Sequence, residues 1–448
     1  KHSFPNINVS HEKAIDKMQV ELGIKYESLQ REAISLALSR GALILTGGPG
    51  TGKTTTLNAI ISIFKGKGDK VLIAAPTGRA AKRISELTGY EAKTIHRLLE
   101  VGYSDNGNMK FLKCEENLLD ADVIIIDEMS MVDTLLFEAL LKAMRLSCRI
   151  IMVGDSDQLP SVGAGNVLKD LIESNMLTLV ELKEIFRQAA ESRIVTNAHR
   201  IVIGDMPDLA TRDSDFFFMQ RLDPQDAEDT IVELCAKRLP RTYKFSPIDD
   251  IQVLTPNRRG TLGCLELNSS LQAELNPQHK DKTEIKYGDI TFRDGDKVMQ
   301  VRNNYDIEWD MKGEKGAGIY NGDIGIIKMI DKRTQTIVID FEGKIAHYNF
   351  DLLLELELAY AITVHKSQGS EFDAVIIPVL GGYDKLYFRN LLYTGVTRAK
   401  KLLILVGSKN RIAFMVGNDR KTLRYTGLKF LIERQIERDS DEGLELFS

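Results

Sequence analysis

The residues best suited to chemistry form a glycine-rich loop near the amino-terminal end of the chain. Residues 47–54, GGPGTGKT, match the pattern GxxxxGK[ST] at every position. Glycines let successive backbone N–H groups converge on phosphate oxygens, and the amino end of a following helix adds partial positive charge. The pattern predicts that Lys53 contacts the β- and γ-phosphates of a nucleotide and that the Thr54 hydroxyl binds Mg²⁺. The predicted nucleotide-binding residues of this loop are Gly48, Pro49, Gly50, Thr51, Gly52, Lys53, Thr54 and Thr55.

Two adjacent acids follow an apolar segment further along the chain. Residues 123–126, VIII, are followed directly by Asp127 and Glu128. A parallel sheet presents its catalytic groups at the carboxyl ends of its strands. We therefore expect Asp127 to hold Mg²⁺ through water, and Glu128 to orient and deprotonate the attacking water. An acidic surface loop is the alternative for a pair of acids that stands alone.

A parallel α/β sheet is the element that could position these residues. Short apolar runs at 42–45, 70–75, 123–126 and 149–153 alternate with amphipathic stretches, which is typical of such a sheet. The same pattern returns at 374–379 and 402–406. The sequence therefore predicts an α/β fold with two lobes. They would comprise residues 1–190 for the first lobe, and 191–285 with 350–448 for the second.

Two smaller features interrupt these lobes. Residues 286–349 contain short alternating segments separated by turn sequences such as Asp294-Gly295, which predicts a small β-barrel inserted into the second lobe. Residues 99–118 contain the strong turn sequence DNGN at 105–108 and are predicted to form a short hairpin. An ordinary loop is the alternative for the second feature.

The composition narrows the class of protein. Hydrophobic residues make up 43% and charged residues 27% of the 448 residues, which is typical of a folded globular chain and not of a disordered one. No apolar run reaches the roughly 18 residues that a membrane span needs, so no membrane partner is expected. The four cysteines form no CxxC pair, which argues against a zinc site and favours a reducing, cytoplasmic location.

Several segments in a fixed order resemble the motif set of superfamily 1 helicases. GGPGTGKTT at 47–55, APTGRAA at 75–81, TIHRLL at 94–99, GDSDQLPSVG at 154–163 and AITVHKSQGSEF at 361–372 are most similar to the RecD/TraA-like branch. This resemblance implies two RecA-like lobes of a P-loop NTPase with ATP between them. It also implies an SH3-like fold for the barrel and a strand-separating pin for the hairpin.

The resemblance further implies roles for single residues. Gln158 is similar to the residue that couples the γ-phosphate to the DNA path, and Arg187 and Arg398 are similar to arginine fingers, which stabilise charge on the transferred phosphoryl group. Gln30 has the donor and the acceptor that adenine recognition needs, although a lone glutamine on a helix is more often a surface residue. The remaining implied nucleotide contacts are Gln368, Gly369 and Glu371.

A second set of residues is implied to contact DNA. Thr77 and Arg79 would meet backbone phosphates through hydroxyl, N–H and guanidinium groups. Lys82 and Arg83 lie further along the same predicted helix, where a solvated face is the more ordinary outcome. His96 has packing within a turn as its alternative. The full predicted DNA set is Pro76, Thr77, Arg79, Thr94, His96, Pro256, Asn257, Arg258, Thr363, His365 and Ser367.

Together these features imply an ATP-dependent DNA helicase that moves 5′ to 3′ and acts in repair or recombination, with the direction resting on the resemblance alone. No set of base-reading side chains is visible, so binding to single-stranded DNA and duplex junctions is expected to be sequence-independent. We expect the protein to work as a monomer. Protein partners in repair or nuclease complexes are compatible with this expectation. The alternatives are a translocase or conjugation motor without strong unwinding, and an ATP-switched DNA-binding subunit.

Overall fold

The computed structural model describes residues 11–103, 109–211, 215–419, 424 and 426–435, and the chain divides into two compact units. The first unit is Lys1–Ala190 with Lys421–Ser448, and the second is Glu191–Arg420. The division after Ala190 agrees with the sequence prediction. The predicted membership of residues 421–448 in the second lobe is wrong, because the described residues there pack on the first unit. Arg424 donates to the carbonyl of Gly165 over 2.9 Å, and Leu428 packs against the core of that unit.

The core of the first unit is a parallel sheet with the strand order β3-β2-β6-β7-β1-β8. Four of its strands coincide with the predicted apolar runs, because a strand covered on both faces must be apolar throughout. The strands are β1 (Ala42–Gly47), β2 (Val71–Ala75), β3 (Ala92–Thr94), β6 (Val123–Ile126), β7 (Arg149–Gly154) and β8 (Thr178–Leu182).

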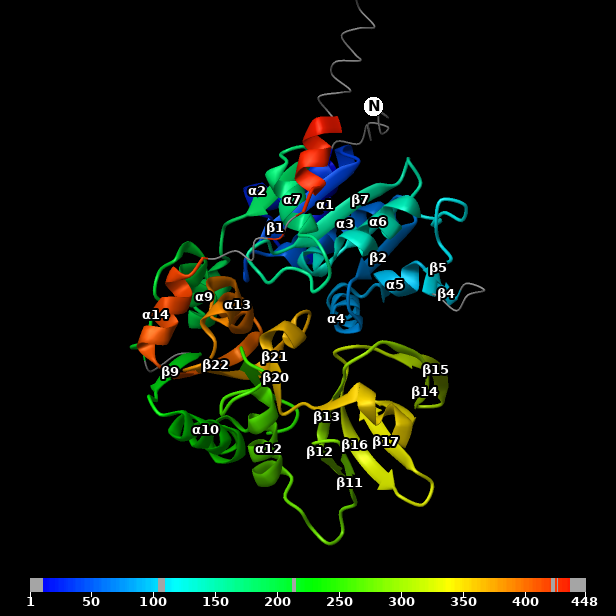
Figure 1. Ribbon diagram of the computed structural model, residues 1–448. Coiled ribbons are helices and arrows are strands. Elements are labelled where there is room, and N and C mark those ends of the chain that lie inside the picture. Colours follow the sequence, from blue (N-terminus) through cyan, green and yellow to red (C-terminus); the bar gives the residue numbers. More distant parts are fainter. Residues whose placement is uncertain (1–10, 104–108, 212–214, 420–423, 425, 436–448) are drawn as a thin grey trace, which may run out of the picture. The chain divides into compact units, whose positions relative to one another are not determined.

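Helices cover both faces of this sheet (Figure 1). Successive side chains of a strand point to opposite faces, so one strand contributes to two cores. Leu43 packs with residues of α1 (His11–Leu22), α2 (Ser28–Ser39) and α3 (Lys53–Gly66). Ile44, its neighbour, packs with residues of α5 (Ile95–Leu98), α6 (Thr134–Lys142) and α7 (Val167–Glu173).

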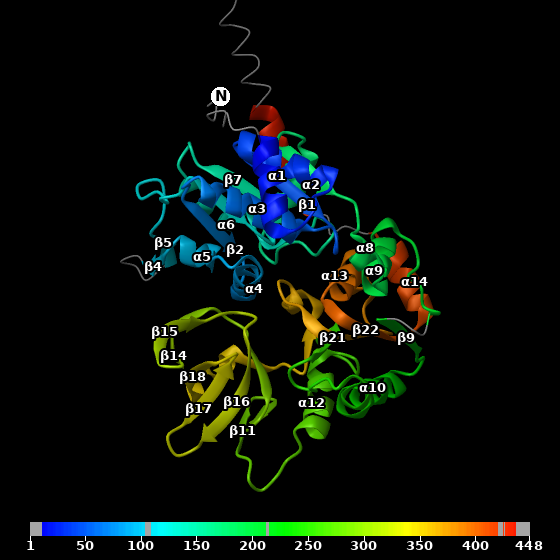
Figure 2. The ribbon, with the colours of Figure 1, turned by 180° about the vertical axis from the view of Figure 1, so that it is seen from behind.

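The second unit contains another parallel sheet, with the order β20-β10-β21-β22-β9. The runs predicted at 374–379 and 402–406 lie within β21 and β22. Figure 2 shows α10 and α12 side by side, and both contribute to one core against the sheet. The strands are β9 (Phe216–Gln220), β10 (Ile251–Thr255), β20 (Ala361–Thr363), β21 (Phe372–Val379) and β22 (Ala399–Gly407). The helices of this unit are α9 (Arg193–Ile203), α10 (Pro224–Glu233), α11 (Leu239–Tyr243), α12 (Cys264–Leu275), α13 (Arg389–Val396) and α14 (Lys409–Gly417).

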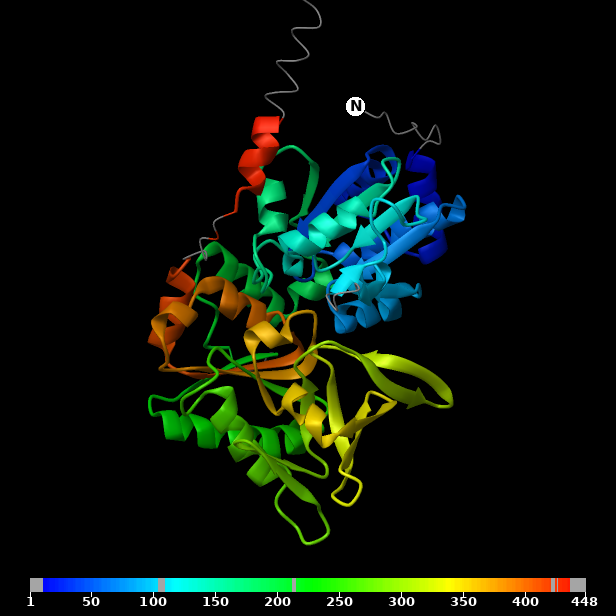
Figure 3. The same ribbon diagram turned by 45° about the vertical axis from the view of Figure 1, so that its right-hand side comes forward.

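An antiparallel domain is inserted between α12 and β20, where the sequence predicts a barrel. Its main sheet has the order β15-β14-β18-β17-β16-β13-β19, and β11 pairs with β12 beside it. The domain is longer than the predicted 286–349, because β11 begins at Glu284 and β19 ends at Leu358. Figure 3 shows the hairpin of β14 and β15 extending from the rest of this sheet. The strands are β11 (Glu284–Tyr287), β12 (Ile290–Arg293), β13 (Lys297–Gln300), β14 (Asn304–Met311), β15 (Glu314–Ile319), β16 (Ile324–Asp331), β17 (Thr336–Phe341), β18 (Lys344–Asn349) and β19 (Leu356–Leu358).

The predicted hairpin at 99–118 is present as two short antiparallel strands, β4 (Val101–Tyr103) and β5 (Met109–Phe111). The turn predicted from DNGN at 105–108 lies outside the described residues. The pairing of Val101 with Phe111 anchors the base of this hairpin beside α5.

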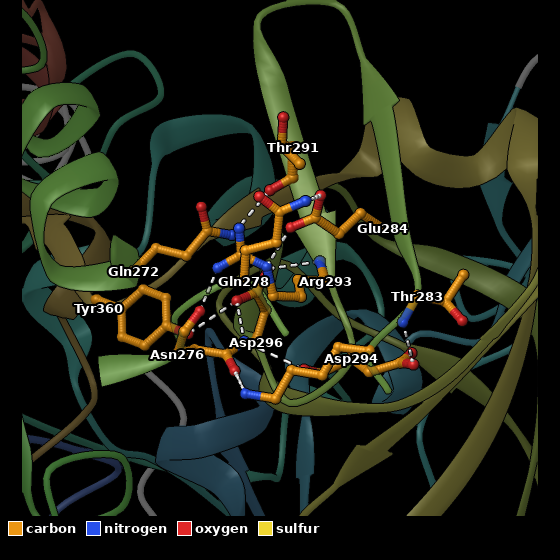
Figure 4. Close-up of polar contacts among 11 residues, drawn as sticks. Gln272, Asn276, Gln278, Thr283, Glu284, Thr291, Arg293, Asp294, Asp296 and Tyr360 are labelled. Atoms are coloured by element: carbon orange, nitrogen blue, oxygen red, sulfur yellow. Dashed lines mark hydrogen bonds and ion pairs between the residues drawn. The ribbon is translucent and has the colours of Figure 1, made fainter. Parts of the chain in front are cut away.

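A buried polar cluster attaches the inserted domain to α12 (Figure 4). Asp296 is fully buried and accepts hydrogen bonds from Gln272 Nε2 at 2.6 Å and Asn276 Nδ2 at 2.7 Å. It also accepts from the Tyr360 hydroxyl at 2.9 Å and the Arg293 N–H at 2.7 Å. Burial raises the pKa of the Asp296 carboxyl, and these four donors oppose that increase. The cluster therefore ties both ends of the insertion to the second lobe.

Two general features of the described residues bear on the class of protein. No helix among them combines the length and the apolar character that a membrane span requires. They contain no group of three or more His, Cys, Asp or Glu side chains placed to hold a metal. The cysteines are all thiols, and three of them are buried.

Candidate nucleotide and DNA sites

The glycine-rich loop connects β1 to α3, as the sequence predicts. Gly50 and Gly52 have φ angles of 74° and 80°, in the left-handed region that favours glycine. Gly52 is also closely packed, because a Cβ there would overlap Gln30 Nε2 and lie 2.5 Å from Phe186 Cε2. Both the backbone conformation and the packing therefore require glycine at position 52.

Lys53, the first residue of α3, folds its side chain back over this loop. Its Nζ donates to the carbonyls of Gly47 and Gly48, the second over 3.0 Å. The buried Thr51 hydroxyl also donates to the Gly48 carbonyl, over 2.9 Å, and fixes the loop. The ammonium group thus lies inside the curve of the loop. Thr54 is half-buried and Thr55 is exposed on the first turn of α3.

Gln30 is buried and not a surface residue. Its Nε2 donates to the Gly52 carbonyl over 3.3 Å, and its Oε1 accepts the Glu27 N–H over 3.1 Å. The second pair of atoms belongs to a capping box at the start of α2. Because a side-chain amide has two N–H donors and two acceptor lone pairs, one of each remains for adenine. The adenine contact of Gln30 therefore stays a prediction.

Asp127 and Glu128 follow β6, one strand away from β7 and two from β1. Burial raises the pKa of Asp127 to about 6, and the negative charge of Glu128 adds to the increase. Arg83 and Lys53 act in the opposite direction on the same carboxyl. Lys53 and the acid pair follow parallel strands that are separated only by β7, so they lie at the same edge of the sheet.

Glu128 has an unusual backbone and a specific partner. Its φ of 52° lies in the left-handed region, a conformation that costs a non-glycine residue free energy. One of its carboxylate oxygens lies 3.8 Å from Arg83 Nη1. The sequence provides no signal for this ion pair, because the two residues are far apart in the chain and Arg83 is one of several basic residues in α4 (Gly78–Thr88).

Gln158 follows β7, the strand between β6 and β1. Its Nε2 donates to the Asp155 carboxylate over 3.2 Å. The buried Asp155 also accepts the Asp157 N–H over 3.0 Å, so its carboxylate fixes the turn that carries Gln158. Gln158 is therefore held beside both the phosphate loop and the acid pair.

The first DNA candidates follow β2. Thr77 is the N-cap of α4, and its hydroxyl accepts the Ala80 N–H over 3.2 Å. Pro76 and Arg79 on either side of it are half-buried. The amino end of this helix thus presents N–H groups and a guanidinium at the same edge of the sheet as the phosphate loop.

The next DNA candidates follow β3, at the end of the sheet. Thr94 is buried, and its hydroxyl caps α5 by accepting the Arg97 N–H over 3.1 Å. The His96 ring packs against Phe111 of β5, with the ring centroids 5.7 Å apart. Burial lowers the pKa of His96, so the structure favours the packing alternative for this residue over a charged contact with DNA.

The strand order separates the two sets of candidates in the first unit. The phosphate loop, the acid pair and Gln158 follow β1, β6 and β7, whereas the DNA candidates follow β2 and β3. All these strands are parallel, so both sets lie along one edge of one sheet. Arg187 begins α8 (Arg187–Ala190) after β8, and its side chain lies outside the described part of the chain.

In the second unit, the DNA candidates form two segments at the carboxyl ends of neighbouring strands. Thr363 ends β20 and pairs in register with Thr255 of β10, after which Pro256, Asn257 and Arg258 follow. Arg258 is exposed and pairs with Glu357 over 3.0 Å. Thr363 is half-buried and His365 is exposed, so both can be reached from solvent.

Two of the predicted DNA contacts in this unit are internal. The Asn257 amide is buried and donates to the Tyr387 hydroxyl over 2.8 Å. The Ser367 hydroxyl is fully buried and donates to the Val364 carbonyl over 2.8 Å. These side chains hold the turns that carry their neighbours, and we withdraw the prediction that they contact DNA.

Arg398 lies at the opposite edge of the second sheet. It precedes β22 and its side chain is only 2% exposed, which excludes a surface ion pair. Its Nη1 donates to the Ser370 carbonyl and its Nε to the Thr394 carbonyl, both over 3.2 Å. The segment that contains Gln368, Gly369 and Glu371 is therefore next to Arg398, as a shared nucleotide role requires.

Three family models match this chain in order. An AAA domain model matches residues 30–164, which contain the phosphate loop, the acid pair and Gln158. The SH3 domain model of ATP-dependent RecD-like DNA helicases matches residues 267–341, and a UvrD-like helicase C-terminal model matches residues 358–406. The SH3-like prediction for the insertion is thereby confirmed.

Two relatives extend the match over most of the chain. The ATP-dependent RecD2 DNA helicase of Deinococcus radiodurans is 34% identical over 366 residues, which cover 82% of this chain and 47% of that protein. The RecBCD enzyme subunit RecD of Mycolicibacterium smegmatis is 31% identical over 433 residues, covering 89% of this chain and 74% of that subunit. The chain thus spans about half of the first relative and about three quarters of the second.

Solved structures agree with the fold. The Pif1 helicase from Bacteroides in complex with ADP-AlF3 and single-stranded DNA gives a TM-score of 0.53 at 20% identity, covering 93% of this chain and 98% of that one. The Pif1 helicase from Candida albicans gives 0.51 at 20% identity, with 90% and 99% covered. The predicted α/β fold with two RecA-like lobes is confirmed. Taken with the mycobacterial relative, which is matched along most of its length, these findings show that the chain belongs to the RecD-like superfamily 1 family of ATP-dependent DNA helicases.

Proposed function

We propose that this chain hydrolyses ATP with Mg²⁺, moves 5′ to 3′ along single-stranded DNA and separates the duplex ahead of it. One observation carries the proposal. Lys53, Glu128 and Gln158 follow three neighbouring strands, and the edge that they share continues directly to Thr77 and Arg79. A nucleotide site and a phosphate-binding helix end are therefore built on one rigid sheet. The 5′-to-3′ direction is supported by membership in the RecD-like family and not by any single residue.

In the first unit, the loop N–H groups and the Lys53 ammonium bind the phosphates of ATP. Gln158 senses the terminal phosphate, and its hydrogen bond to Asp155 supports this role by fixing the side chain. Glu128 accepts a proton from the attacking water, which raises the nucleophilicity of that water. Bound Mg²⁺ would neutralise charge on the β- and γ-phosphates.

Thr54 and Asp127 are the residues that would hold this Mg²⁺. Their hydroxyl and carboxylate oxygens are the ligands that Mg²⁺ prefers, and the ion usually takes one or two carboxylates together with substrate phosphates. Burial and the charge of Glu128 raise the pKa of Asp127 to about 6, so a cation beside this acid pair would offset an unfavourable arrangement. The donor set therefore fits the ion.

In the second unit, we propose that Arg398 and the segment of Gln368, Gly369 and Glu371 serve the nucleotide. The Arg398 guanidinium is held by two carbonyls, so its orientation is set in advance. Arg258, Thr363 and His365, at the opposite edge of that sheet, serve the DNA strand. Because the nucleotide contacts and the DNA contacts lie at opposite edges of one sheet, a shift of this lobe on ATP binding or hydrolysis would also shift its contacts with DNA. Arg187 stays a proposed second arginine finger.

We further propose that contact with DNA is sequence-independent, and that the chain works as a monomer in repair or recombination. Helix N–H groups and guanidinium groups bind phosphates without reading bases. Relatives from mycobacteria are named as subunits of the RecBCD enzyme, so a protein partner in a nuclease complex is compatible with this proposal.

The decisive experiment compares unwinding of a duplex with a 5′ tail and a duplex with a 3′ tail, in ATP and Mg²⁺, with Lys53→Ala as the inactive control. We expect strand separation from the 5′ tail only, and none with the variant. Unwinding of the duplex with the 3′ tail alone would contradict the proposed 5′-to-3′ direction and indicate the opposite one.

Two further outcomes would identify the alternatives. Displacement of streptavidin from a single strand without duplex separation would indicate a translocase. Tight ATP binding without turnover stimulated by DNA would indicate an ATP-switched binding subunit.

A further inference from the structure

The ion pair between Arg83 and Glu128 links the two candidate sites of the first unit. The side chains are 35% and 12% exposed, and their closest charged atoms are 3.8 Å apart. A pair that is shielded from water on one side interacts more strongly than a fully exposed one, yet it is not buried deeply enough to be permanent. The ion pair between the Glu128 carboxylate and Arg83 can therefore be broken when another anion binds Arg83.

Arg83 lies on the helix that begins at the proposed DNA contact. Thr77 caps α4, and Arg79 and Arg83 are four residues apart on it, which places them on the same helix face. One helical turn, about 5.4 Å, separates their positions along the axis. A DNA phosphate bound at Thr77 and Arg79 would therefore be within reach of the long, flexible Arg83 side chain.

We propose that Arg83 is a positioning residue that restrains Glu128 until single-stranded DNA is bound. Without DNA, the guanidinium attracts the carboxylate and keeps it from orienting the attacking water. A phosphate of the bound strand competes for the same guanidinium and leaves Glu128 available to water. Both partners are anions, and the 3.8 Å pair with Glu128 is partly open to water, so a phosphate of a bound strand can compete for the guanidinium. This inference rests on the proposed function, since it assigns a regulatory role within the same site.

The test measures ATP turnover with and without oligothymidylate for the wild type, Arg83→Ala and Arg83→Lys. Lys82→Ala is the matched control, because Lys82 is the basic neighbour of Arg83 on α4 and pairs with Glu86 over 3.9 Å. We expect Arg83→Ala to raise DNA-independent kcat by about fivefold, as expected for the loss of a half-exposed ion pair. The stimulation by DNA should fall by the same factor, with KM for ATP unchanged.

Arg83→Lys should keep most of the restraint, because it retains the positive charge, and Lys82→Ala should show wild-type stimulation. This rescue pattern would not follow from a merely structural role. Two outcomes would overturn the inference: a stimulation ratio in Arg83→Ala equal to that of the wild type, or a loss of turnover both with and without DNA. If turnover by the wild type itself does not respond to DNA, the proposed function fails, whatever Arg83→Ala does.

Discussion

Truncation of Asp296 tests whether the buried cluster fixes the inserted domain to the second lobe. In Asp296→Ala, the Gln272 and Asn276 amides, the Tyr360 hydroxyl and the Arg293 N–H lose a common acceptor. A buried donor left without a partner costs about 1–3 kcal/mol, although water can satisfy some of them. Removal of a carboxylate whose burial is itself unfavourable offsets part of this loss. We therefore expect the inserted domain to lose about 2–4 kcal/mol of stability.

The chain offers a selective probe for this measurement. Trp309, in β14, is the only tryptophan, so its fluorescence reports unfolding of the inserted domain. With a urea m-value of about 2 kcal/mol/M, the expected loss lowers the midpoint by roughly 1–2 M. Asp306→Ala, which removes an exposed acid from the same strand, is the control and should leave the midpoint unchanged. Equal midpoints for the two variants would refute the role that we assign to the cluster.

Three further predictions concern the loop, the arginine of the second unit and the pH dependence. Gly52→Ala should weaken nucleotide binding about tenfold or more, because an alanine at φ 80° costs about 1–2 kcal/mol and its Cβ displaces Gln30 and Phe186. A fluorescent-nucleotide titration measures this, with Gly68→Ala as a control of similar φ and open surroundings. Arg398→Lys should lower kcat for ATP by about a hundredfold with little change in KM, since lysine lacks the guanidinium fork; an unchanged kcat would remove Arg398 from the site. Burial raises the pKa of Asp296 above its unfolded value, so the folded state binds the proton more tightly and loses stability as the pH rises from about 4 through the folded pKa. Wild-type stability, followed by Trp309 fluorescence, should therefore fall more over this rise in pH than the stability of Asp296→Asn; identical pH profiles would contradict the assignment.

The parts of the molecule that the sequence predicts well are those that local chemistry dictates. The segment VIII at 123–126 must be a buried strand, since its side chains point alternately to two faces and all are apolar. Gly50 and Gly52 have positive φ angles, which favour glycine. The spacing of the glycines and Lys53 in GGPGTGKT is sufficient to predict the phosphate loop. The turn DNGN at 105–108 correctly placed a hairpin, because strands β4 and β5 on either side of it are paired.

The parts that the sequence does not predict depend on contacts between distant residues. Ser367 and Asn257 lie within a helicase-like motif, but only the packed structure shows that their side chains are internal. The predicted insertion, 286–349, is too short, because β19 lies beyond its end. Strand β19 is recognised only from its pairing with β13, which is far away in the sequence, and neither strand shows an alternation of polar and apolar residues that would mark its end. The sequence of residues 421–448 contains no pattern that assigns it to the first unit, whereas the structure packs Leu428 and Ile432 against the core of that unit.

The strand order offers a short physical route from DNA to the chemistry. Neighbouring strands are about 4.8 Å apart, and β2, which precedes Thr77, is directly hydrogen-bonded to β6, which precedes Asp127 and Glu128. The candidate DNA site and the acid pair are close enough to affect each other without a series of side-chain movements across the lobe. In the proposed exchange, a DNA strand at the start of α4 would compete with the Glu128 carboxylate, at the end of β6, for the Arg83 guanidinium. Coupling would then be a local exchange of charge partners.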